Sequence, residues 1–294
     1  MELDQTLIAM RSAVDRTLED LLTASDALPY ASLFSAAQYT ALSPGKRLRP
    51  ILTCIVATGY GAPIEHALAP ACALEMIHAY SLIHDDLPCM DNDVLRRGRP
   101  TLHKVYPEWH ALLAGDFLLT YAFEVLATAP HLSSDQKLSL VATLAKHAGA
   151  HGMIGGQMVD LLSVGKSIDY ATLEIMHLYK TASLIVAAVI SGATIAKAPA
   201  ADLPHLQTAA ESIGFAFQLI DDVLDIEGSE LEIGKPLGSD AQKHKPTAVT
   251  LLGIQKSKEV AEELLQKAYL SLKSLSQPLP LLTELFDQMI RRKR

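Results

Sequence analysis

Two short acidic segments of the chain contain the residue types that bind a divalent metal ion. Residues 81–93 read SLIHDDLPCMDND, and residues 218–227 read QLIDDVLDIE. In both, paired aspartates follow an apolar run and a further aspartate comes soon after. The candidate metal ligands are Asp85, Asp86, Asp91, Asp221, Asp222 and Asp225. Like charges this close repel one another, and removing them from water is costly, so either water surrounds these carboxylates or a cation lies among them.

The expected position of both clusters favours the cation. Each cluster should lie at the C-terminal end of an apolar helix, where the helix dipole disfavours negative charge. Asp221 and Asp225 are four residues apart and therefore share one helix face. Sites rich in carboxylate oxygens that also hold substrate phosphates suit Mg²⁺. An acidic helix end in water explains a single cluster equally well, but the second copy favours magnesium.

The first cluster contains a proline that should shape it. Pro88 disfavours helical geometry at Leu87, the residue before it. We therefore expect the helix to end or deform there, so that Asp91 turns back toward Asp85.

Basic residues near the clusters predict an anionic substrate. Arginine gives bidentate contacts to phosphate and lysine gives a point charge. Each residue alone is more often on the surface, but together with the acidic clusters they indicate diphosphates bridged by Mg²⁺. The candidates are Lys46 and Arg49 in GKRLRP, Arg96 and Arg97 after the first cluster, Lys180 in an apolar helix, and Lys235 and Lys245 around the loop after the second cluster.

Composition and charge exclude several classes of function. The chain has 294 residues, a formal net charge of −8 and only 5% aromatic residues, so no basic field draws it to nucleic acid or anionic lipid. Its three cysteines lack metal-ligand spacing and fit a reducing compartment. The N-terminus is unlike a signal peptide, and the longest uncharged apolar run, about residues 181–196, is shorter than a typical membrane span. We expect a cytoplasmic protein.

The elements that position these residues are predicted to be helices. Apolar residues recur at helical spacing nearly throughout, with Gly and Pro in the gaps. An all-α fold with almost no strand is expected, as one domain over residues 1–294. The helices are predicted over residues 3–25, 49–59, 64–86, 109–128, 134–163, 169–196, 202–226, 241–254, 256–275 and 279–291.

Three predicted segments, 64–86, 109–128 and 169–226, carry little polar surface. Helices that are apolar on most sides lie inside a bundle, so we place these three in the interior of one large helical bundle. An exposed apolar face on one of them would indicate a homodimer.

Six separated motifs give the chain a specific resemblance. They are GKRLRP, HDDLPCMDNDVLRRGRPTLHK, GGQMVD, the KT of HLYKTASL, FQLIDDVLD, and the GK and K-x-T that follow. In this order, over about residues 43–250, they resemble the trans-isoprenyl diphosphate synthases. The longer first motif, Asp-Asp-x-x-x-x-Asp, is similar to that of the short-chain bacterial and plant branch, which makes farnesyl (C15) or geranylgeranyl (C20) diphosphate. The resemblance implies a helical bundle around a central apolar cavity, and a homodimer.

The resemblance also implies roles for the candidate residues. The six aspartates would hold Mg²⁺, three ions per site, and these ions would grip the allylic diphosphate. Lys245 would lie in a loop that closes over the substrates, and a Gly-containing loop at 228–240 would act as a lid. Arg96, Lys180 and Lys235 would add charge at the allylic diphosphate, Lys46, Arg49, His78 and Arg97 would hold isopentenyl diphosphate, and Thr181 and Gln218 would line the reaction centre beside Lys180 and Lys235.

The implied reaction joins isopentenyl diphosphate to dimethylallyl or geranyl diphosphate by ionisation, condensation and elimination. Tyr80 and Ser81 lie five and four residues before Asp85, so their side chains should lie roughly one turn, about 7.5 Å, deeper along the helix. Aromatic residues near these positions limit the product in the family, and Tyr-Ser resembles farnesyl synthases more than geranylgeranyl ones. Alternatively, Tyr80 only fills the core. His84 either orients a carboxylate or packs against another helix.

The chain departs from the family pattern at two positions. Ala182 and Ala248 stand where the family usually has glycine and tyrosine.

Two other functions are compatible with parts of the sequence. A terpene cyclase would not need the second Asp-Asp-x-x-Asp or the cations for a second diphosphate. A non-catalytic subunit of a hetero-oligomeric synthase should have lost chelating aspartates, and all six are present here.

Overall fold

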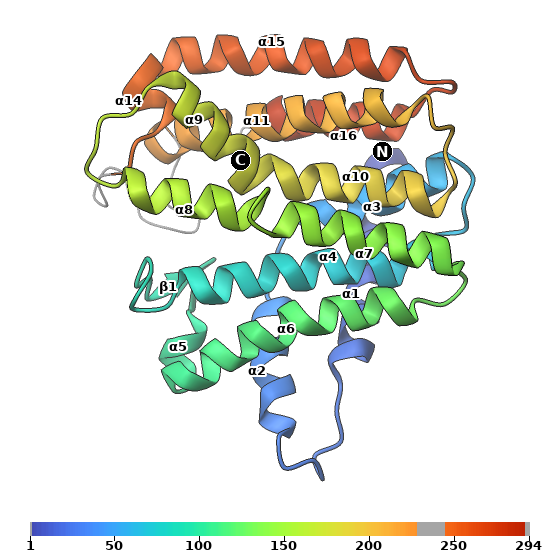
Figure 1. Ribbon diagram of the computed structural model, residues 1–294, viewed down its shortest axis with the longest axis vertical. Coiled ribbons are helices and arrows are strands. Elements are labelled where there is room, and N and C mark those ends of the chain that lie inside the picture. The colour runs from blue at the N-terminus through green and yellow to red at the C-terminus, as the bar shows by residue number, and fades with distance from the viewer. Residues whose placement is uncertain (1, 228–244, 292–294) are drawn as a thin grey trace.

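Helices make up nearly all of the regular structure in the computed structural model, which describes residues 2–227 and 245–291 (Figure 1). The predicted all-α class is confirmed. The helices are α1 (Glu2–Leu22), α2 (Ala31–Ala41), α3 (Leu48–Gly59), α4 (Ile64–Asp85), α5 (Leu102–Val105), α6 (Glu108–Thr128), α7 (Ser134–Ala148), α8 (Met153–Ser163), α9 (Tyr170–His177), the π-helical turn η1 (Leu178–Ala182), α10 (Ser183–Ile195), α11 (Leu203–Glu227), α14 (Ala248–Leu252), α15 (Ile254–Lys273) and α16 (Pro280–Arg291). Two short antiparallel strands, β1 (Leu95–Arg96) and β2 (Arg99–Pro100), form a hairpin.

Most predicted helices are present, but three predictions were wrong in detail. The single helix predicted over 134–163 is two helices, because the chain turns sharply between α7 and α8, where a side chain on Gly152 would collide with the carbonyl group of His147. Helix α2 was missed because its buried face consists only of alanines, which give a weak apolar pattern. Of the helix predicted over 241–254, α14 covers only Ala248–Leu252, and residues 241–244 lie outside the described part of the chain.

Helices α4 and α10 form the interior of the bundle, as predicted. Helix α4 contacts α1, α2, α3, α6, α7 and α10, and α10 is buried along nearly its whole length. Small residues bring these helices close together. A side chain on Gly192 in α10 would collide with the backbone of α3 at Thr53. The resulting core is close-packed and places the ends of several helices at one end of the bundle.

The prediction that residues 109–128 lie in the interior was wrong. Helix α6 buries one face, with Ala111, Ala114 and Leu118, against the core. Trp109 and Leu113 on its outer face are 63% and 49% exposed. Apolar composition alone does not distinguish a helix buried in one chain from a helix covered by another molecule.

Two helical stretches among the described residues are long and apolar enough to cross a membrane by length and composition alone, Glu108–Thr128 and Tyr170–Ile195. The protein itself buries 72% of the apolar window in the second and 39% in the first. Core helices of a folded domain meet the same criteria, so this is weak evidence for a membrane span.

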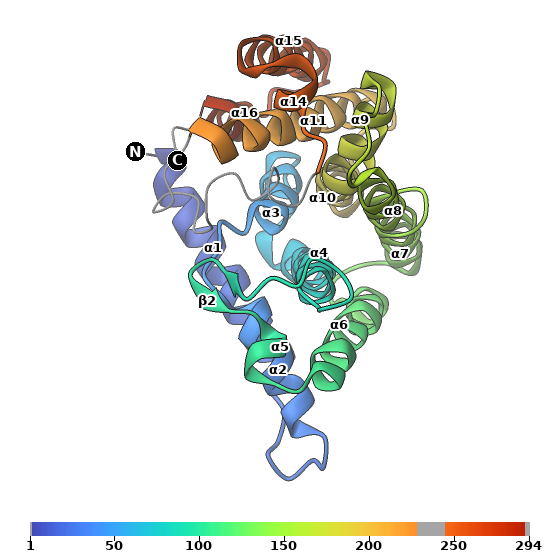
Figure 2. The same cartoon turned by 90° about the vertical axis from the view of Figure 1, so that its left-hand side faces the viewer.

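Several elements that carry candidate residues meet at one end of the bundle. The hairpin, α8, α9 and α14 all lie at the end of the bundle that is at the left of Figure 1, and Figure 2, which looks onto that end, shows the hairpin on one side of it and α8 and α9 on the other. Helix α4 also ends there, at Asp85. The fold therefore brings together segments that are more than 100 residues apart in the sequence.

Candidate active site

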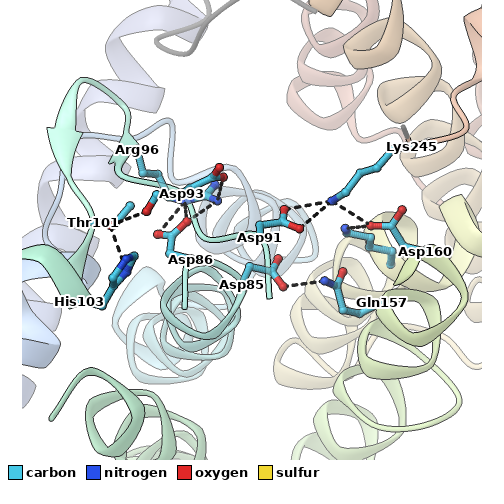
Figure 3. A network of polar contacts seen from close by, with 11 residues as sticks. Asp85, Asp86, Asp91, Asp93, Arg96, Thr101, His103, Gln157, Asp160 and Lys245 are labelled. Atoms are coloured by element: carbon cyan, nitrogen blue, oxygen red, sulfur yellow. Dashed lines mark hydrogen bonds and ion pairs between the residues drawn. The ribbon is translucent and has the colours of Figure 1, made fainter. Parts of the chain in front are cut away.

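The first acidic cluster has the shape predicted from Pro88. Helix α4 ends at Asp85, and the N–H group of Asp91 donates a hydrogen bond of 2.8 Å to the carbonyl oxygen of Asp85. The N–H group of Asn92, which has a φ of 51°, donates to the carbonyl oxygen of Leu87. This turn brings the carboxylates of Asp85 and Asp91 to the same side (Figure 3).

The three aspartates of this cluster have different partners. Asp85 Oδ1 accepts a hydrogen bond of 2.7 Å from Gln157 Nε2 on α8. Both carboxylate oxygens of Asp91 lie 3.0 Å from Lys245 Nζ. Asp86, which is only 3% exposed, points the other way and is bound by Arg96 at 2.7–3.0 Å (Figure 3). Asp86 therefore orients Arg96, and Asp85 with Asp91 faces the rest of the site.

Local geometry fixes the positions of Arg96 and Arg97. They belong to the β1–β2 hairpin, whose two turn residues, Arg97 and Gly98, both have positive φ, 53° and 73°. Such a pair forms the two-residue turn that matches the twist of a hairpin. The turn directs Arg96 to Asp86, whereas Arg97 Nη1 donates to the carbonyl oxygen of Pro44, before α3.

In the second cluster, Asp222 is the best-anchored carboxylate. It is 4% exposed and accepts hydrogen bonds from the Ala248 N–H (2.7 Å) and from Gln218 Nε2 (2.9 Å). Gln218 in turn accepts a hydrogen bond of 2.7 Å from Thr181 Oγ1. The predicted reaction-centre residues Thr181 and Gln218 thus form a chain that ends on Asp222. Asp225 is also buried, and Asp221 is half-buried.

The two departures from the family pattern fit this structure. The contact of residue 248 with Asp222 is made by its backbone, so alanine preserves it, and the Thr247 side chain, which caps α14, directs that N–H group. Ala182 packs directly on Gly214 of α11, where a side chain would collide with it. The extra methyl group of Ala182 is therefore accommodated by a glycine on the facing helix.

Lysines and one buried carboxylate join the two clusters. Lys180 Nζ lies 2.6 Å from Asp160 Oδ2, and Lys245 Nζ lies 3.4 Å from the same oxygen. Lys180 lies in the π-helical turn η1, whose backbone approaches α8 so closely that a side chain on Gly156 would collide with it. π-Turns within α-helices often occur at functional sites.

Gln157 and Asp160 were missed as individual site residues, although their motif GGQMVD was noticed. Their three-residue spacing places both on the same side of α8, within a helix that is otherwise apolar. Two polar side chains that share the inner side of such a helix are the signal that would have identified them.

A cationic region surrounds the residues predicted to hold isopentenyl diphosphate. Burial, and next the positive charges of Arg49 and Arg97, lower the pKa of His78 well below its usual value. Burial also lowers the pKa of Arg49, whose Nε has no hydrogen-bond partner among the described residues. Lys46 is exposed and lines a pocket of about 300 Å³ with Phe217. The carboxylates of Glu75 and Asp221 act on the pKa of Arg49 in the opposite direction, with a smaller effect than burial.

Arg47, in the same segment, has a structural role. Its guanidinium group is 3% exposed and forms ion pairs with Asp15 (2.7 Å) and Glu75 (3.0 Å). Of the three cations in GKRLRP, Lys46 and Arg49 therefore remain as candidates for substrate binding.

Tyr80 and Ser81 lie before the first cluster in α4, as predicted. Tyr80 is 5% exposed, its ring lies edge-on to that of His84 with centroids 5.7 Å apart, and its hydroxyl has no hydrogen-bond partner among the described residues. Burial raises the pKa of Tyr80 to about 12. Ser81 Oγ donates to the carbonyl oxygen of His78. His84 lies 3.0 Å from the carbonyl oxygen of Leu112, so it packs against α6 and does not orient a carboxylate of the cluster.

Charges within the site partly compensate one another. Burial raises the pKa of the Asp85 carboxyl, and the Lys180 ammonium acts in the opposite direction. Burial also raises the pKa of Asp86, against its hydrogen bonds from Arg96. Both carboxyl groups are therefore held at the edge of an apolar region by neighbouring cations. Lys235 and the predicted lid at 228–240 lie outside the described residues.

The donor set of the site fits Mg²⁺. Within residues 2–227 and 245–291, no three His, Cys, Asp or Glu side chains converge to hold a metal ion by themselves. Mg²⁺ does not require this, because it is usually bound by one or two carboxylates together with waters and substrate phosphates. Asp85 and Asp91, linked by a backbone hydrogen bond, supply such a pair.

Comparison with known proteins gives consistent matches along the chain. The family model for polyprenyl synthetase matches residues 31–278. The farnesyl diphosphate synthase of Bacillus subtilis (strain 168) is 43% identical over 258 residues, 87% of this chain and 87% of that protein. The geranylgeranyl diphosphate synthase of Cyanophora paradoxa is 45% identical over 238 residues, 80% of this chain and 79% of that protein. A crystal structure of a geranyltransferase from Helicobacter pylori, complexed with magnesium and isoprenyl diphosphate, has a TM-score of 0.82 and 34% identity, covering 97% of this chain and 96% of that chain.

Proposed function

Because the chain belongs to the polyprenyl synthetase family and is a short-chain trans-prenyltransferase, we propose that it makes farnesyl diphosphate. The substrates would be isopentenyl diphosphate and the allylic dimethylallyl and geranyl diphosphates. The presence of all six aspartates argues against a non-catalytic subunit, and the second acidic cluster argues against a terpene cyclase.

One observation supports the placement of the reaction best. Lys245 contacts Asp91 of the first cluster, and Ala248, three residues later, contacts Asp222 of the second. Three residues span at most about 11 Å of backbone, to which the Lys245 side chain adds its own length, so the two clusters lie on two sides of one gap that residues 245–248 bridge. A diphosphate held between them would contact metal ions on both sides.

The enzyme depends on Mg²⁺, and we propose that three ions bind at the two clusters. Asp85 and Asp91 would be ligands on one side, and Asp221, Asp222 and Asp225 on the other. Bound Mg²⁺ supplies Lewis-acid stabilisation of the pyrophosphate leaving group. In our proposal Asp86 contributes indirectly, by fixing the position of Arg96 beside the first cluster.

The side chains of the protein would carry the rest of the reaction. Lys180 and Arg96 place positive charge beside the allylic diphosphate, where negative charge develops as the C–O bond breaks. The resulting carbocation is attacked by the alkene of isopentenyl diphosphate, held by Lys46, Arg49, His78 and Arg97. The proton lost afterwards goes to the departing pyrophosphate, so no protein base is required. Thr181 and Gln218 are proposed to line this centre, and Lys245 to act beside it; Lys235 is also proposed to take part, but it lies outside the described residues.

The C15 product is proposed because of Tyr80. Its buried ring lies one helical turn deeper than Asp85, where it would end the space for a growing apolar chain. Geranylgeranyl diphosphate is the alternative product, favoured by the similarity to the Cyanophora paradoxa enzyme.

We propose that the active form is a homodimer of one-domain, cytoplasmic subunits. Trp109, Leu112 and Leu113 of α6 are 45–63% exposed, and Ile154, Met158 and Leu162 of α8 are 48–58% exposed. The three α8 residues recur every four positions and form a continuous apolar stripe. Exposed apolar surface of this kind, on two helices of one molecule, fits an interface with a second copy.

The proposed function can be tested by incubating the purified protein with isopentenyl and dimethylallyl diphosphates and Mg²⁺, and measuring product chain length. We expect a C15 product and no activity in the presence of a chelator. Asp91→Asn should lose at least about a hundredfold in kcat/KM, whereas Asp202→Asn, which alters a buried aspartate outside the site, should not. No chain elongation, or elongation that survives the chelator, would refute the mechanism.

A further inference from the structure

Asp160 on α8 occupies an unusual position between two cations. It is 4% exposed, and its Oδ2 atom lies 2.6 Å from Lys180 Nζ and 3.4 Å from Lys245 Nζ. The two ammonium groups therefore lie within about 6 Å of each other, close enough to repel strongly if no anion lay between them. A single buried carboxylate oxygen holds them together.

The two lysines come from different parts of the chain. Lys180 belongs to η1, and Lys245 precedes α14. Lys245 also binds both oxygens of Asp91, in the first acidic cluster. Asp160 thus connects three segments at the gap where the diphosphate is proposed to bind (Figure 3).

A purely structural ion pair would not need this arrangement. The Lys180 side chain is 31% exposed and could be solvated without a partner, whereas that of Lys245 is 10% exposed. The contact from α8 to Asp85 in the first cluster is made by Gln157, one turn earlier than Asp160. Its contacts are with the cations, which points to control of where their ammonium groups lie.

We propose that Asp160 is a positioning residue for prenyl transfer: it holds the ammonium groups of Lys180 and Lys245 side by side, facing the diphosphate of the allylic substrate. On binding of a diphosphate at Asp91, Lys245 would exchange that carboxylate for phosphate oxygens while Asp160 kept its ammonium group in place. This inference rests on the proposed function, because the allylic diphosphate is assigned to this gap there.

Kinetics with each substrate varied separately tests this role. Asp160→Asn should lower kcat/KM for dimethylallyl diphosphate by at least about tenfold, with KM for isopentenyl diphosphate changed by less than about twofold. Asp160→Glu, which keeps the charge, should recover part of the loss. Asp202→Asn is the matched control, because Asp202 is equally buried but binds Tyr60 and Ser276 away from the site. Equal losses for both substrates, or no loss, would overturn the proposal.

A double-mutant cycle separates positioning from a general loss of structure. If Asp160 acts through Lys245, the effects of Asp160→Asn and Lys245→Met on the allylic substrate should be clearly less than additive. Additive effects with a lowered melting temperature would instead indicate a structural role and refute the inference.

Binding of inorganic pyrophosphate with Mg²⁺, measured by calorimetry, keeps this test independent of turnover. We expect Asp160→Asn, or Asp160→Glu if the first variant does not fold, to weaken pyrophosphate binding, by about tenfold for Asn and by less for Glu. If the unaltered protein elongates no prenyl chain but Asp160→Asn still weakens pyrophosphate binding, the proposed function fails and the role of Asp160 in positioning the lysines for a diphosphate stands. If the unaltered protein is active and pyrophosphate binding is unchanged in the variant, only the role of Asp160 fails.

Discussion

Replacing Tyr80 with alanine should lengthen the product beyond fifteen carbons. Tyr80 is 5% exposed and lies five residues before Asp85, about 7.5 Å along the helix axis. Truncation removes the ring that would meet the end of a C15 chain. Each additional buried carbon contributes about 0.8 kcal/mol, so a further five-carbon unit could gain up to about 4 kcal/mol of binding free energy.

The substitution should reduce stability only moderately. Replacing a buried aromatic residue with alanine typically costs about 3–5 kcal/mol of unfolding free energy. The hydroxyl of Tyr80 has no hydrogen-bond partner among the described residues, and removing a buried unsatisfied hydroxyl regains about 1–3 kcal/mol. We therefore expect a net loss of about 2 kcal/mol, which leaves a folded enzyme whose products can be analysed.

The assay is chromatographic analysis of the products formed from dimethylallyl and isopentenyl diphosphates. For Tyr80→Ala, C20 or longer products should exceed C15. The matched control is Tyr80→Phe, which keeps the ring and removes the unpartnered hydroxyl. It should retain the C15 product and melt at the same or a higher temperature. An unchanged C15 profile in Tyr80→Ala would refute the assignment of Tyr80 as the end of the cavity.

Three further predictions concern pairing, pH and assembly. Arg96→Met leaves Asp86 buried without its partner and should lower the free energy of unfolding by about 3 kcal/mol in denaturant titrations, an effect that adding Asp86→Leu should largely reverse. Burial lowers the pKa of His177 to about 4. The unfolded chain takes up this proton near pH 6.5, so the contribution of neutral His177 to stability is fully present above that pH. The free energy of unfolding should therefore fall by about 2 kcal/mol when the pH is lowered to 5. If His177→Gln showed the same pH dependence in melting curves, this expectation would be wrong. Leu113→Glu, on the exposed face of α6, should shift the protein from dimer to monomer in analytical ultracentrifugation, whereas an unchanged sedimentation coefficient would argue against that interface.

Local rules predicted the parts of the site that depend on local geometry. Pro88 limits the residue before it wherever the segment lies, so the turn that brings Asp91 to Asp85 followed from sequence. The long apolar helices were also predictable, because their periodicity extends over many residues. The break between α7 and α8 was not, since glycine is tolerated within a helical pattern and only the close approach at Gly152 decides the outcome.

The contacts of the acidic clusters could not be predicted in the same way, because their partners are distant in sequence. Gln157 is 72 residues from Asp85, and Lys245 is 154 residues from Asp91. A single sequence shows which carboxylates need compensation, but the choice among several lysines and arginines depends on how the helices pack. Asp160 illustrates this limit, since its role is defined entirely by two cations from other segments.

The partners of the clustered aspartates show how their negative charges are compensated. Compensation at the helix end does not come from one cation alone. Arg96 neutralises Asp86, Lys245 neutralises Asp91, and a backbone N–H group satisfies Asp222. Protein groups thus hold these carboxylates in place, and under the proposed function a metal-bound diphosphate would enter by exchange with these partners. Because Lys245 is shared between Asp91 and Asp160, it can leave the first without losing its position, which is the property that such an exchange requires.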